Sequence, residues 1–449
     1  MKIYIETYGC QMNEYDSEIV TTILESRTHE ITRDIEDANA ILLNTCAIRE
    51  NAHQRIYGRL GDLSHYKKRD KKLIIGILGC MAQNLKEELL EKRKLVDLVV
   101  GPDGYKTLPK MLEEIYGEGA TKLSEISLSE KETYSDVIPK RDPNGVNAWI
   151  AIMRGCDNFC TFCVVPFTRG RERSRTVENI VEEAKYLVAQ GYKQITLLGQ
   201  NVNSYKDSTT NETFTDLMRA VSEIEGLKRL RFTSPHPKDF PIELLELIAE
   251  KDNICNQVQI PLQAGSNRVL EKMNRTYTKE EFLTLIENAK RIIPNVKLST
   301  DVIVGFPTET EEEFLETLEV MEKSQFHTAY MFKYSERKGT PAERMFPDDV
   351  SAADKKSRIM RLVEQQQNIQ WKLYENEIGM VHEVLIEGIS ERSEKDFLAR
   401  TEGNLNVVFP VTEEVKIGDL VKVHIQKASS KTLFGEILPN FANIEKVEV

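Results

Sequence analysis

The sequence predicts an α/β protein built in three parts: an N-terminal domain of βαβ units on a parallel sheet, a central partial (βα)6 barrel, and a small antiparallel β-barrel. Short β-branched-rich runs alternate with amphipathic stretches over residues 1–117, and six further strand and helix units fill 147–375. Short alternating strands with turn signals follow over 376–441. Residues 118–146 are polar, aperiodic and broken by Pro and Gly, which predicts a linker.

The first part contains four predicted strands, which span residues 2–7, 38–44, 72–79 and 95–102. Cys10, Cys46 and Cys80 each stand just beyond one of the first three strands. Because the carboxyl ends of parallel strands share one edge, we expect these thiols to converge where open α/β sheets bind ligands. Three inert buried thiols are the alternative interpretation.

The central part predicts a barrel-like sheet, with a flat doubly wound sheet as the alternative. Its six predicted strands are followed by a long helical stretch at about 351–377. In a barrel of this kind the chemistry belongs at the C-terminal strand ends. A cysteine triplet follows the first strand, and Gln200, Ser234 and Gln263 follow the next three.

The triplet is the stretch "RGCDNFCTFC", which places Cys156, Cys160 and Cys163 within eight positions. A buried helix face could show this spacing, but glycine, aspartate, asparagine and proline neighbours argue against it. Structural zinc usually draws on two close pairs of ligands, whereas this motif supplies three thiolates. His236 is the candidate for a fourth zinc ligand, but a hydrogen-bonded structural role is expected for it. Three thiolates suit a [4Fe-4S] cluster with one open iron, which we favour over zinc. Cys255 has no such placement and is interpreted as a core thiol.

Composition limits the classes of function. The chain has 449 residues, no apolar run long enough to span a bilayer, and no charged segment leading into a signal core, so the cytoplasm is the expected location. Seven cysteines in a reducing compartment indicate metal or catalytic use. A net charge of -12 argues against coating nucleic acid through bulk positive charge. Arg169, Arg171, Arg173 and Arg175 form the best local basic stretch, with a solvated face as the alternative.

Longer motifs point to a known family. The segments "TYGCQMNEYDSE", "NTCAIRENA", "GCMAQ", "RGCDNFCTFCVVPFTRGRERSR", "LGQNVNSY" and "DVIVGFPTET" together resemble the radical S-adenosylmethionine (SAM) methylthiotransferases, most closely the MiaB-type tRNA methylthiotransferases. The resemblance covers nearly the whole chain, including a C-terminal segment similar to the TRAM RNA-binding domain. It implies installation of a methylthio group at C2 of N6-isopentenyladenosine-37 in tRNA.

The resemblance also implies the cofactors. A [4Fe-4S] cluster on Cys156, Cys160 and Cys163 is expected to bind SAM and donate an electron to it, so that a deoxyadenosyl radical abstracts the C2 hydrogen. An auxiliary [4Fe-4S] cluster on the three upstream cysteines is expected to hold the sulfur, methylated by another SAM. Both clusters should face one cavity, because the substrate radical must meet its sulfur donor before it is quenched.

The remaining site residues and partners are expectations of the same kind. Phe162, Gln200, Ser234 and Gln263 are candidates for contacting SAM or substrate, with loop anchoring and capping of strand ends as the alternative roles. Arg171, Arg173 and Arg175 are expected to hold substrate phosphate or to order the active-site loops. The expected partners are a tRNA anticodon stem-loop containing isopentenyladenosine-37 and an electron donor such as flavodoxin or ferredoxin, with no membrane. Nothing in the sequence requires more than a monomer.

Two other functions remain open at this stage. One is a methylthiotransferase that acts on threonylcarbamoyladenosine-37 of tRNA or on a ribosomal protein. The other is a noncatalytic iron-sulfur protein that binds RNA and senses redox state. The motifs "GCQMNEYDS" and "CVVPFTRGRERSR" fit the isopentenyladenosine subgroup better.

Overall fold

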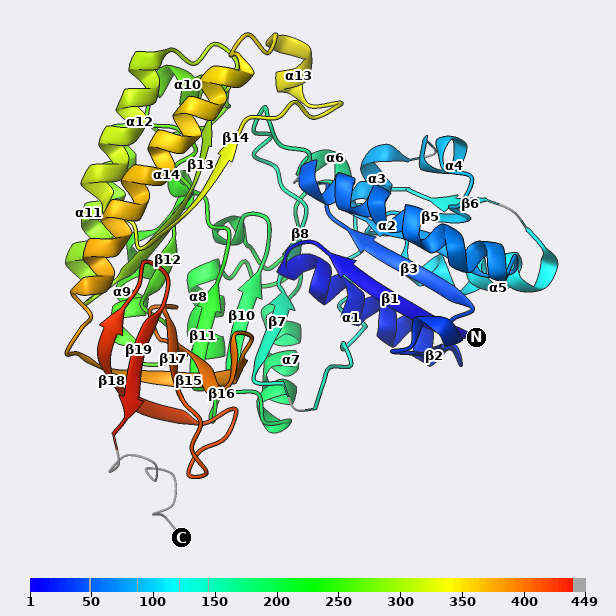
Figure 1. Ribbon diagram of the computed structural model, residues 1–449, viewed down its shortest axis with the longest axis horizontal. Helices are drawn as coiled ribbons and strands as arrows, with labels where there is room; N and C mark the ends of the chain where they lie inside the picture. The colour runs from blue at the N-terminus through cyan, green and yellow to red at the C-terminus, as the bar shows by residue number, and fades with distance from the viewer. Residues whose placement is uncertain (48–49, 87, 121, 144, 439–449) are drawn as a thin grey trace.

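The computed structural model describes residues 1–449 except 48–49, 87, 121, 144 and 439–449. Two residues of the "NTCAIRENA" motif and the predicted end of the last domain, 439–441, therefore lie outside the described residues. Figure 1 shows three bodies in chain order, with the central one between the N-terminal domain and the C-terminal barrel. No helix in the described ranges is long and apolar enough to cross a membrane.

The N-terminal domain is a six-stranded parallel sheet in the order β2-β1-β3-β4-β5-β6. Its central strands β3 and β4 are buried at every position, as expected for a parallel sheet covered on both faces. The four predicted strands are confirmed. The elements are β1 (Lys2–Tyr8), α1 (Gln11–Ser26), β2 (Glu30–Ile31), β3 (Ala40–Thr45), α2 (Glu50–Arg69), β4 (Ile74–Gly79), α3 (Cys80–Leu85), α4 (Glu88–Lys92), β5 (Leu98–Val100), α5 (Leu108–Glu118) and β6 (Leu123–Glu125).

The segment 118–146, predicted as a linker, belongs in part to this domain. Strand β6 lies within it and extends the sheet by pairing with β5. Tyr134 is fully buried, donates a hydrogen bond to the Pro102 carbonyl oxygen (2.9 Å) and accepts one from the Tyr105 backbone N–H (3.1 Å). A three-residue strand carries too little periodicity to be recognised in a polar segment, which is why the prediction missed it.

The central body is the predicted partial barrel of six parallel strands. Two three-stranded sheets, β11-β10-β7 and β12-β13-β14, are connected by a parallel bridge between Leu230 and Ile254. The strands thus follow chain order from β7 to β14. They are β7 (Asn147–Ala151), β10 (Gln194–Leu198), β11 (Arg229–Phe232), β12 (Gln257–Gln259), β13 (Lys297–Val304) and β14 (Thr328–Lys333). A short antiparallel pair, β8 (Met153–Arg154) with β9 (Arg173–Ser174), flanks the loop that carries the cysteine triplet.

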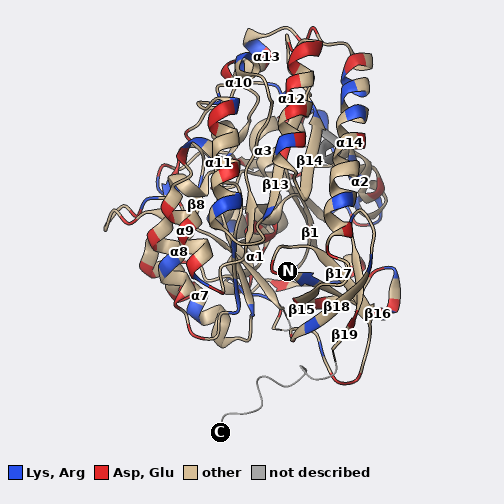
Figure 2. Ribbon diagram, turned by 90° about the vertical axis from the view of Figure 1, so that its left-hand side faces the viewer, with Lys and Arg blue, Asp and Glu red and all other residues tan. Residues whose placement is uncertain are grey.

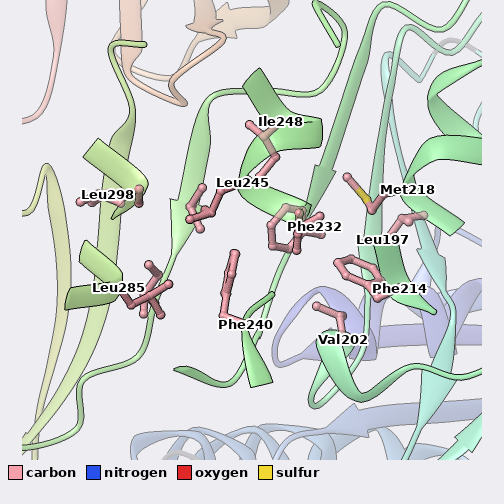
Figure 3. Packing of buried hydrophobic residues seen from close by; sticks show 14 of the residues in the cluster. Leu197, Val202, Phe214, Met218, Phe232, Phe240, Leu245, Ile248, Leu285 and Leu298 are labelled. Atoms are coloured by element: carbon pink, nitrogen blue, oxygen red, sulfur yellow. The ribbon is translucent and has the colours of Figure 1, made fainter. Parts of the chain in front are cut away.

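Most helices of the central body cover the outside of the partial barrel, whereas α6 (Val165–Arg169) lies beside α3 of the N-terminal domain (Figure 1). The other helices are α7 (Val177–Ala189), α8 (Phe214–Ser222), α9 (Ile242–Glu250), α10 (Asn267–Lys272), α11 (Lys279–Ile292), α12 (Glu311–Ser324), α13 (Pro341–Met345) and α14 (Ala352–Glu375). Thr213, Thr278 and Thr310 begin α8, α11 and α12 with capping boxes, which satisfy the first free backbone N–H groups. Figure 3 shows the side chains packed between these helices and the strands, where the rings of Phe214 and Phe232 meet edge to face at 5.3 Å.

The C-terminal body is a closed five-stranded barrel in the order β15-β16-β17-β19-β18. Its strands are β15 (Val381–Ser390), β16 (Ser393–Thr401), β17 (Asn406–Pro410), β18 (Leu420–Ala428) and β19 (Leu433–Ile437). The predicted small barrel is confirmed, with one difference: β17 and β19 pair in parallel, whereas the other pairs are antiparallel. Closure leaves no free sheet edge.

The C-terminal barrel is attached to the central body through its own backbone. Arg229 donates hydrogen bonds to the carbonyl oxygens of Arg400 (2.7 Å) and Glu383 (3.0 Å). Arg231 donates one to the carbonyl oxygen of Thr401 (3.0 Å). Both arginines belong to β11, so one strand of the central sheet positions the C-terminal barrel.

Asp16 is one of the buried carboxylates that attach the N-terminal domain to the central body. Asp16 of α1 accepts hydrogen bonds from Arg154 (2.7 Å) and Arg169 (2.7 Å), and the hydroxyl of Tyr105 lies 3.3 Å away. All four side chains are buried. Burial alone raises the pKa of a carboxyl group, but the charges of the two arginines hold the pKa of Asp16 below its ordinary value.

Replacing this carboxylate should loosen the attachment. Asp16→Asn leaves two buried guanidinium groups without a counter-charge, so we expect the free energy of unfolding to fall by about 3–5 kcal/mol. Denaturant titration followed by circular dichroism measures this change. In the parent protein the contribution of Asp16 is complete above the carboxyl pKa of the unfolded chain, and it disappears as the pH falls through the lower pKa of the folded state.

A matched control is the exposed ion pair between Lys2 and Asp37, whose atoms lie 2.9 Å apart. Asp37→Asn should change the free energy of unfolding by less than about 1 kcal/mol, because solvent screens exposed pairs. Equal effects of the two substitutions would contradict the role given to Asp16.

Candidate functional site

The three upstream cysteines meet at one edge of the N-terminal sheet. The strand register sets Tyr8 opposite Thr45, and Thr45 opposite Gly79, so the ends of β1, β3 and β4 are level. Cys46 fixes this alignment further, because its backbone N–H donates to the Tyr8 carbonyl oxygen at 3.0 Å. Cys10 and Cys80 then begin helices α1 and α3 at the same edge. The three thiols therefore lie at one edge of the sheet, as the sequence predicts.

Polar contacts hold the loops of these cysteines together. Asn13 bridges them: its side-chain oxygen lies 3.5 Å from Cys10 Sγ, and its amide group donates to the Asn44 side chain at 3.2 Å. Asn44 in turn donates to the Asn13 carbonyl oxygen at 2.9 Å. A hydrogen bond with Cys46 lowers the pKa of the Cys10 thiol to about 6. The Cys10 site therefore favours the thiolate, which is the form that binds metal.

The cysteine triplet lies in the loop between β8 and α6. Gly155 begins this loop with a φ of 80°, and a Cβ atom there would lie 2.0 Å from the carbonyl oxygen of Arg171. Only glycine fits this close approach of two backbones. The loop is anchored at its centre by Thr161, whose backbone N–H donates to Met273 and whose carbonyl oxygen accepts from Ala342. Burial raises the pKa of Cys156 and Cys163 to about 12.

Each cysteine trio has one buried arginine beside it. Arg169 Nε lies 3.2 Å from Cys80 Sγ, and Arg275 Nη1 lies 3.4 Å from Cys160 Sγ. A guanidinium group stays charged at any physiological pH, so each one offsets negative charge on a trio of thiolates. All six cysteines are free thiols. Two sets of three thiols, each with a buried cation, suit anionic iron-sulfur clusters.

The zinc alternative fits these residues less well. The ring of His236, the possible fourth ligand, accepts a hydrogen bond from the Lys238 backbone N–H through Nδ1. Burial lowers its pKa to about 3, so the ring is neutral. It packs against Tyr277 at 5.7 Å between ring centroids, in keeping with the structural role expected from the sequence.

A cavity of about 650 Å³ runs from the upstream cysteines into the partial barrel. Its N-terminal wall contains Cys10, Cys46 and Cys80, and Val165 and Arg169 of α6 lie beside them. The C-terminal barrel contributes Glu387, Arg400, Gly403 and Asn404 to the lining of the cavity. All three bodies therefore line one cavity, which includes the carboxyl edge of the N-terminal parallel sheet, where α/β folds characteristically bind ligands.

The candidate contact residues do not all reach this cavity. Gln200 and Ser234 line it, and the Oε1 atom of Gln200 is buried without a hydrogen-bond partner among the described residues. Gln263 is not a lining residue, and its backbone pairs with Val302 of β13. Phe162 packs on the core of the central body. The cysteine triplet also lies outside the lining of the cavity. Contact of Phe162, Gln200, Ser234 and Gln263 with SAM or substrate stays a prediction.

Two of the three arginines proposed to bind substrate are used inside the protein. Arg173 pairs with buried Asp103 (2.9 Å), and Arg175 pairs with buried Glu183 (2.7 Å). Both guanidinium groups are buried on carboxylates, which favours for these two the loop-ordering role that the sequence analysis gave beside phosphate binding. Arg171 is different: 67% of its side chain is exposed, and its Nε lies 3.0 Å from the carboxylate of Asp157. Of these three arginines, Arg171 alone keeps an exposed guanidinium side chain that is available to a phosphate.

The sequence analysis missed several residues that build the site. Asp16, Arg154 and Arg275 were not singled out, and Arg169 was noticed only as part of a basic stretch. No local signal distinguishes a buried Asp on an amphipathic helix from an exposed one. Cys255, interpreted as a core thiol, is buried.

Comparison with known proteins defines the class. A model described as the radical SAM superfamily matches residues 150–321, one described as uncharacterized protein family UPF0004 matches 2–101, and a TRAM domain model matches 375–438. The partial barrel with its cysteine triplet is thus that of a radical SAM protein, which implies SAM and a [4Fe-4S] cluster.

Whole-chain relatives define the family. A protein of Chloroherpeton thalassium named tRNA-2-methylthio-N(6)-dimethylallyladenosine synthase is 47% identical over 437 residues, which cover 97% of this chain and 96% of the relative. A protein of Bacteroides fragilis with the same name is 46% identical over 439 residues, which cover 97% and 95% of the two chains. The chain belongs to this family of synthases. The resemblance inferred from the motifs is confirmed.

Solved structures support the fold. The radical SAM methyltransferase TsrM of Kitasatospora setae superimposes with a TM-score of 0.58 at 15% identity, over 76% of this chain and 77% of its own. The cobalamin-dependent radical SAM enzyme OxsB superimposes with a TM-score of 0.54 at 13% identity, over 82% and 62%. At these identities the likeness concerns the fold.

The close approach at Gly155 generates a stability prediction. Gly155→Ala combines an unfavourable φ with a backbone clash, so we expect the free energy of unfolding to fall by about 1–3 kcal/mol. Gly117→Ala is the matched control, because Gly117 lies in α5 with nothing within 4 Å of the added Cβ. That substitution should stabilise the protein by about 0.5–1 kcal/mol, since alanine favours helix. Denaturant titration compares them, and the same sign for both would contradict the analysis.

Proposed function

We propose that this protein is a radical SAM methylthiotransferase that installs a methylthio group at C2 of N6-isopentenyladenosine-37 in tRNA. Identity of 46–47% along the whole chain to synthases of that name is the observation that carries the proposal. The names of these relatives favour the dimethylallyl (isopentenyl) substrate over threonylcarbamoyladenosine or a ribosomal protein. The radical SAM match favours an enzyme over a noncatalytic sensor.

We infer that the chain holds two clusters. Cys156, Cys160 and Cys163 are the proposed ligands of one, and the three upstream cysteines are the proposed ligands of an auxiliary one. When bound, the first cluster would supply the electron that cleaves SAM, and the auxiliary cluster would hold the sulfur that is transferred. The free thiols and the arginine beside each trio support this assignment. The domain bounds 1–117, 147–375 and 376–441 remain part of the proposal.

Helix α6 limits the distance between the two trios. Arg169 stands six positions after Cys163, and its guanidinium group reaches Cys80. At 1.5 Å of rise per residue, a short helix and one arginine side chain separate the trios by at most roughly 20 Å. The triplet itself is outside the lining of the cavity, and we infer from this short separation that a substrate held beside α6 lies near both trios, as radical transfer requires.

The protein residues around the cavity have three tasks in this proposal. Gln200 offers an unpartnered buried oxygen as a hydrogen-bond acceptor for a ligand, and Ser234 lies beside it on the cavity wall. The C-terminal barrel lines part of the cavity and, in this proposal, limits the access of water to a radical. Arg171 is the proposed phosphate contact.

The proposed partner is the anticodon stem-loop of tRNA, together with an electron donor such as flavodoxin or ferredoxin, in the cytoplasm. A broad basic surface is not part of the proposal, since the net charge is -12. Figure 2 shows acidic and basic residues interspersed along α11, α12 and α14. We expect RNA to be recognised by local contacts and by the base itself, with a single chain acting as a monomer.

A deletion strain tests the substrate. Mass analysis of its tRNA nucleosides should show isopentenyladenosine that lacks the methylthio group, and the gene restored in trans should return the modified nucleoside. Loss of a methylthio group from threonylcarbamoyladenosine in place of isopentenyladenosine would transfer the assignment to the other tRNA substrate. An unchanged nucleoside profile would overturn the proposal.

Cysteine variants test the two clusters. After anaerobic reconstitution the parent should contain about eight irons per chain, and replacement of either trio by alanine should leave about four. Cys255→Ala is the control and should keep about eight. With SAM and a reductant, the upstream variant should still form 5′-deoxyadenosine without a methylthio product, whereas the triplet variant should form neither. Zinc in place of iron, or loss of all iron from both variants, would contradict the assignment.

A further inference from the structure

Two aromatic side chains on the cavity wall have no structural explanation within the fold. Tyr330 and Phe332 are 47% and 38% exposed, and both line the cavity that contains the upstream thiols. Within the described part of the chain, neither side chain takes part in a hydrogen bond, an ion pair or a ring contact. Exposed aromatic rings gathered in a cavity are typical of a binding surface.

The backbone of β14 gives these rings a fixed direction. Side chains alternate along a strand, so Thr328, Tyr330 and Phe332 line the cavity, whereas Ala329 and Met331 pack on the core of the central body. The strand is the last of its sheet, at the open side of the partial barrel that faces the N-terminal domain in Figure 1. The two rings therefore form an apolar surface on a rigid element beside the opening.

The lining of the same cavity also contains the sulfur atoms of the upstream trio. Cys10, Cys46 and Cys80 line it from the N-terminal domain, together with Met12. A flat ligand that rests on the aromatic rings would therefore share one cavity with these thiols. The volume of about 650 Å³ lies within the range of pockets that hold a group of the size of a substituted purine.

We propose that Tyr330 and Phe332 form a stacking platform that receives the flipped-out N6-isopentenyladenine base of the RNA substrate. This inference rests on the proposed function. A base must leave its stack before chemistry can reach its ring carbon, and aromatic side chains in a pocket stabilise the extruded base. A neutral purine with an apolar N6 chain suits an aromatic wall, and such contacts supply affinity to a protein of net charge -12.

Binding of a fluorescent anticodon stem-loop to the reconstituted holoenzyme tests the platform. The RNA carries isopentenyladenosine at the target position, and fluorescence anisotropy gives its Kd. Tyr330→Ala combined with Phe332→Ala should weaken binding about tenfold or more, because stacking contributes that much per base. Tyr330→Phe keeps the ring and should bind like the parent. Tyr186→Ala is the matched control, since Tyr186 is also 47% exposed but lies on α7, outside the cavity lining.

A second RNA identifies the nucleotide that the rings contact. The same stem-loop with an abasic target position should bind the parent about tenfold more weakly, and the double variant should show little further loss. If the double variant binds the modified RNA as tightly as the parent does, the platform is overturned. An equal loss on the intact and the abasic RNA would place the rings against another nucleotide and also overturn the assignment.

Two activity measurements separate this inference from the proposed function. The double variant should still form 5′-deoxyadenosine from SAM in the absence of RNA, which shows that the protein is folded and loaded, while its KM for RNA rises in methylthiolation. If the parent forms no methylthio product on this RNA, the proposed function fails. If the parent forms product and the double variant keeps the parental KM, the platform alone fails.

Discussion

The buried carboxylate of Asp16 is the interaction on which the arrangement of the site depends. It joins α1, which begins at Cys10, to Arg154 before the cysteine triplet and to Arg169 after it. Arg169 in turn contacts Cys80. One network of charges therefore touches both ends of the loop that carries the triplet and two loops of the upstream trio. Because this charge network is buried, loss of any one member would leave an unpaired charge away from water. The network therefore fixes how the two domains are oriented.

Each of the three bodies supplies a different part of the site. The N-terminal sheet supplies thiols at one edge, and residues of the partial barrel and of the C-terminal barrel complete the lining of the cavity. The partial barrel leaves one side open at β14, where a large substrate can approach. A fully closed central barrel would fill its interior with its own side chains and leave little room for a base.

Much of this arrangement was accessible from the sequence, for identifiable reasons. Long apolar runs such as β3 and β4 predict buried parallel strands, and cysteines just after them predict a shared edge. β6 was missed because a strand of three residues shows no periodicity. The sequence left two roles open for Arg173 and Arg175, because an arginine that binds a buried carboxylate and one that binds phosphate look alike in sequence. Asp16 and Arg275 act through contacts distant in the chain, which no local pattern encodes.

The attachment of the C-terminal barrel has a consequence for its evolution. Arg229 and Arg231 donate hydrogen bonds to main-chain carbonyl groups, which every amino acid possesses. Glu387 and Glu402 also contact the central body through their side chains. Side chains of this module that do not contact the central body can therefore change in evolution without removing the main-chain attachment. Substitution of either arginine would remove hydrogen bonds that attach the barrel.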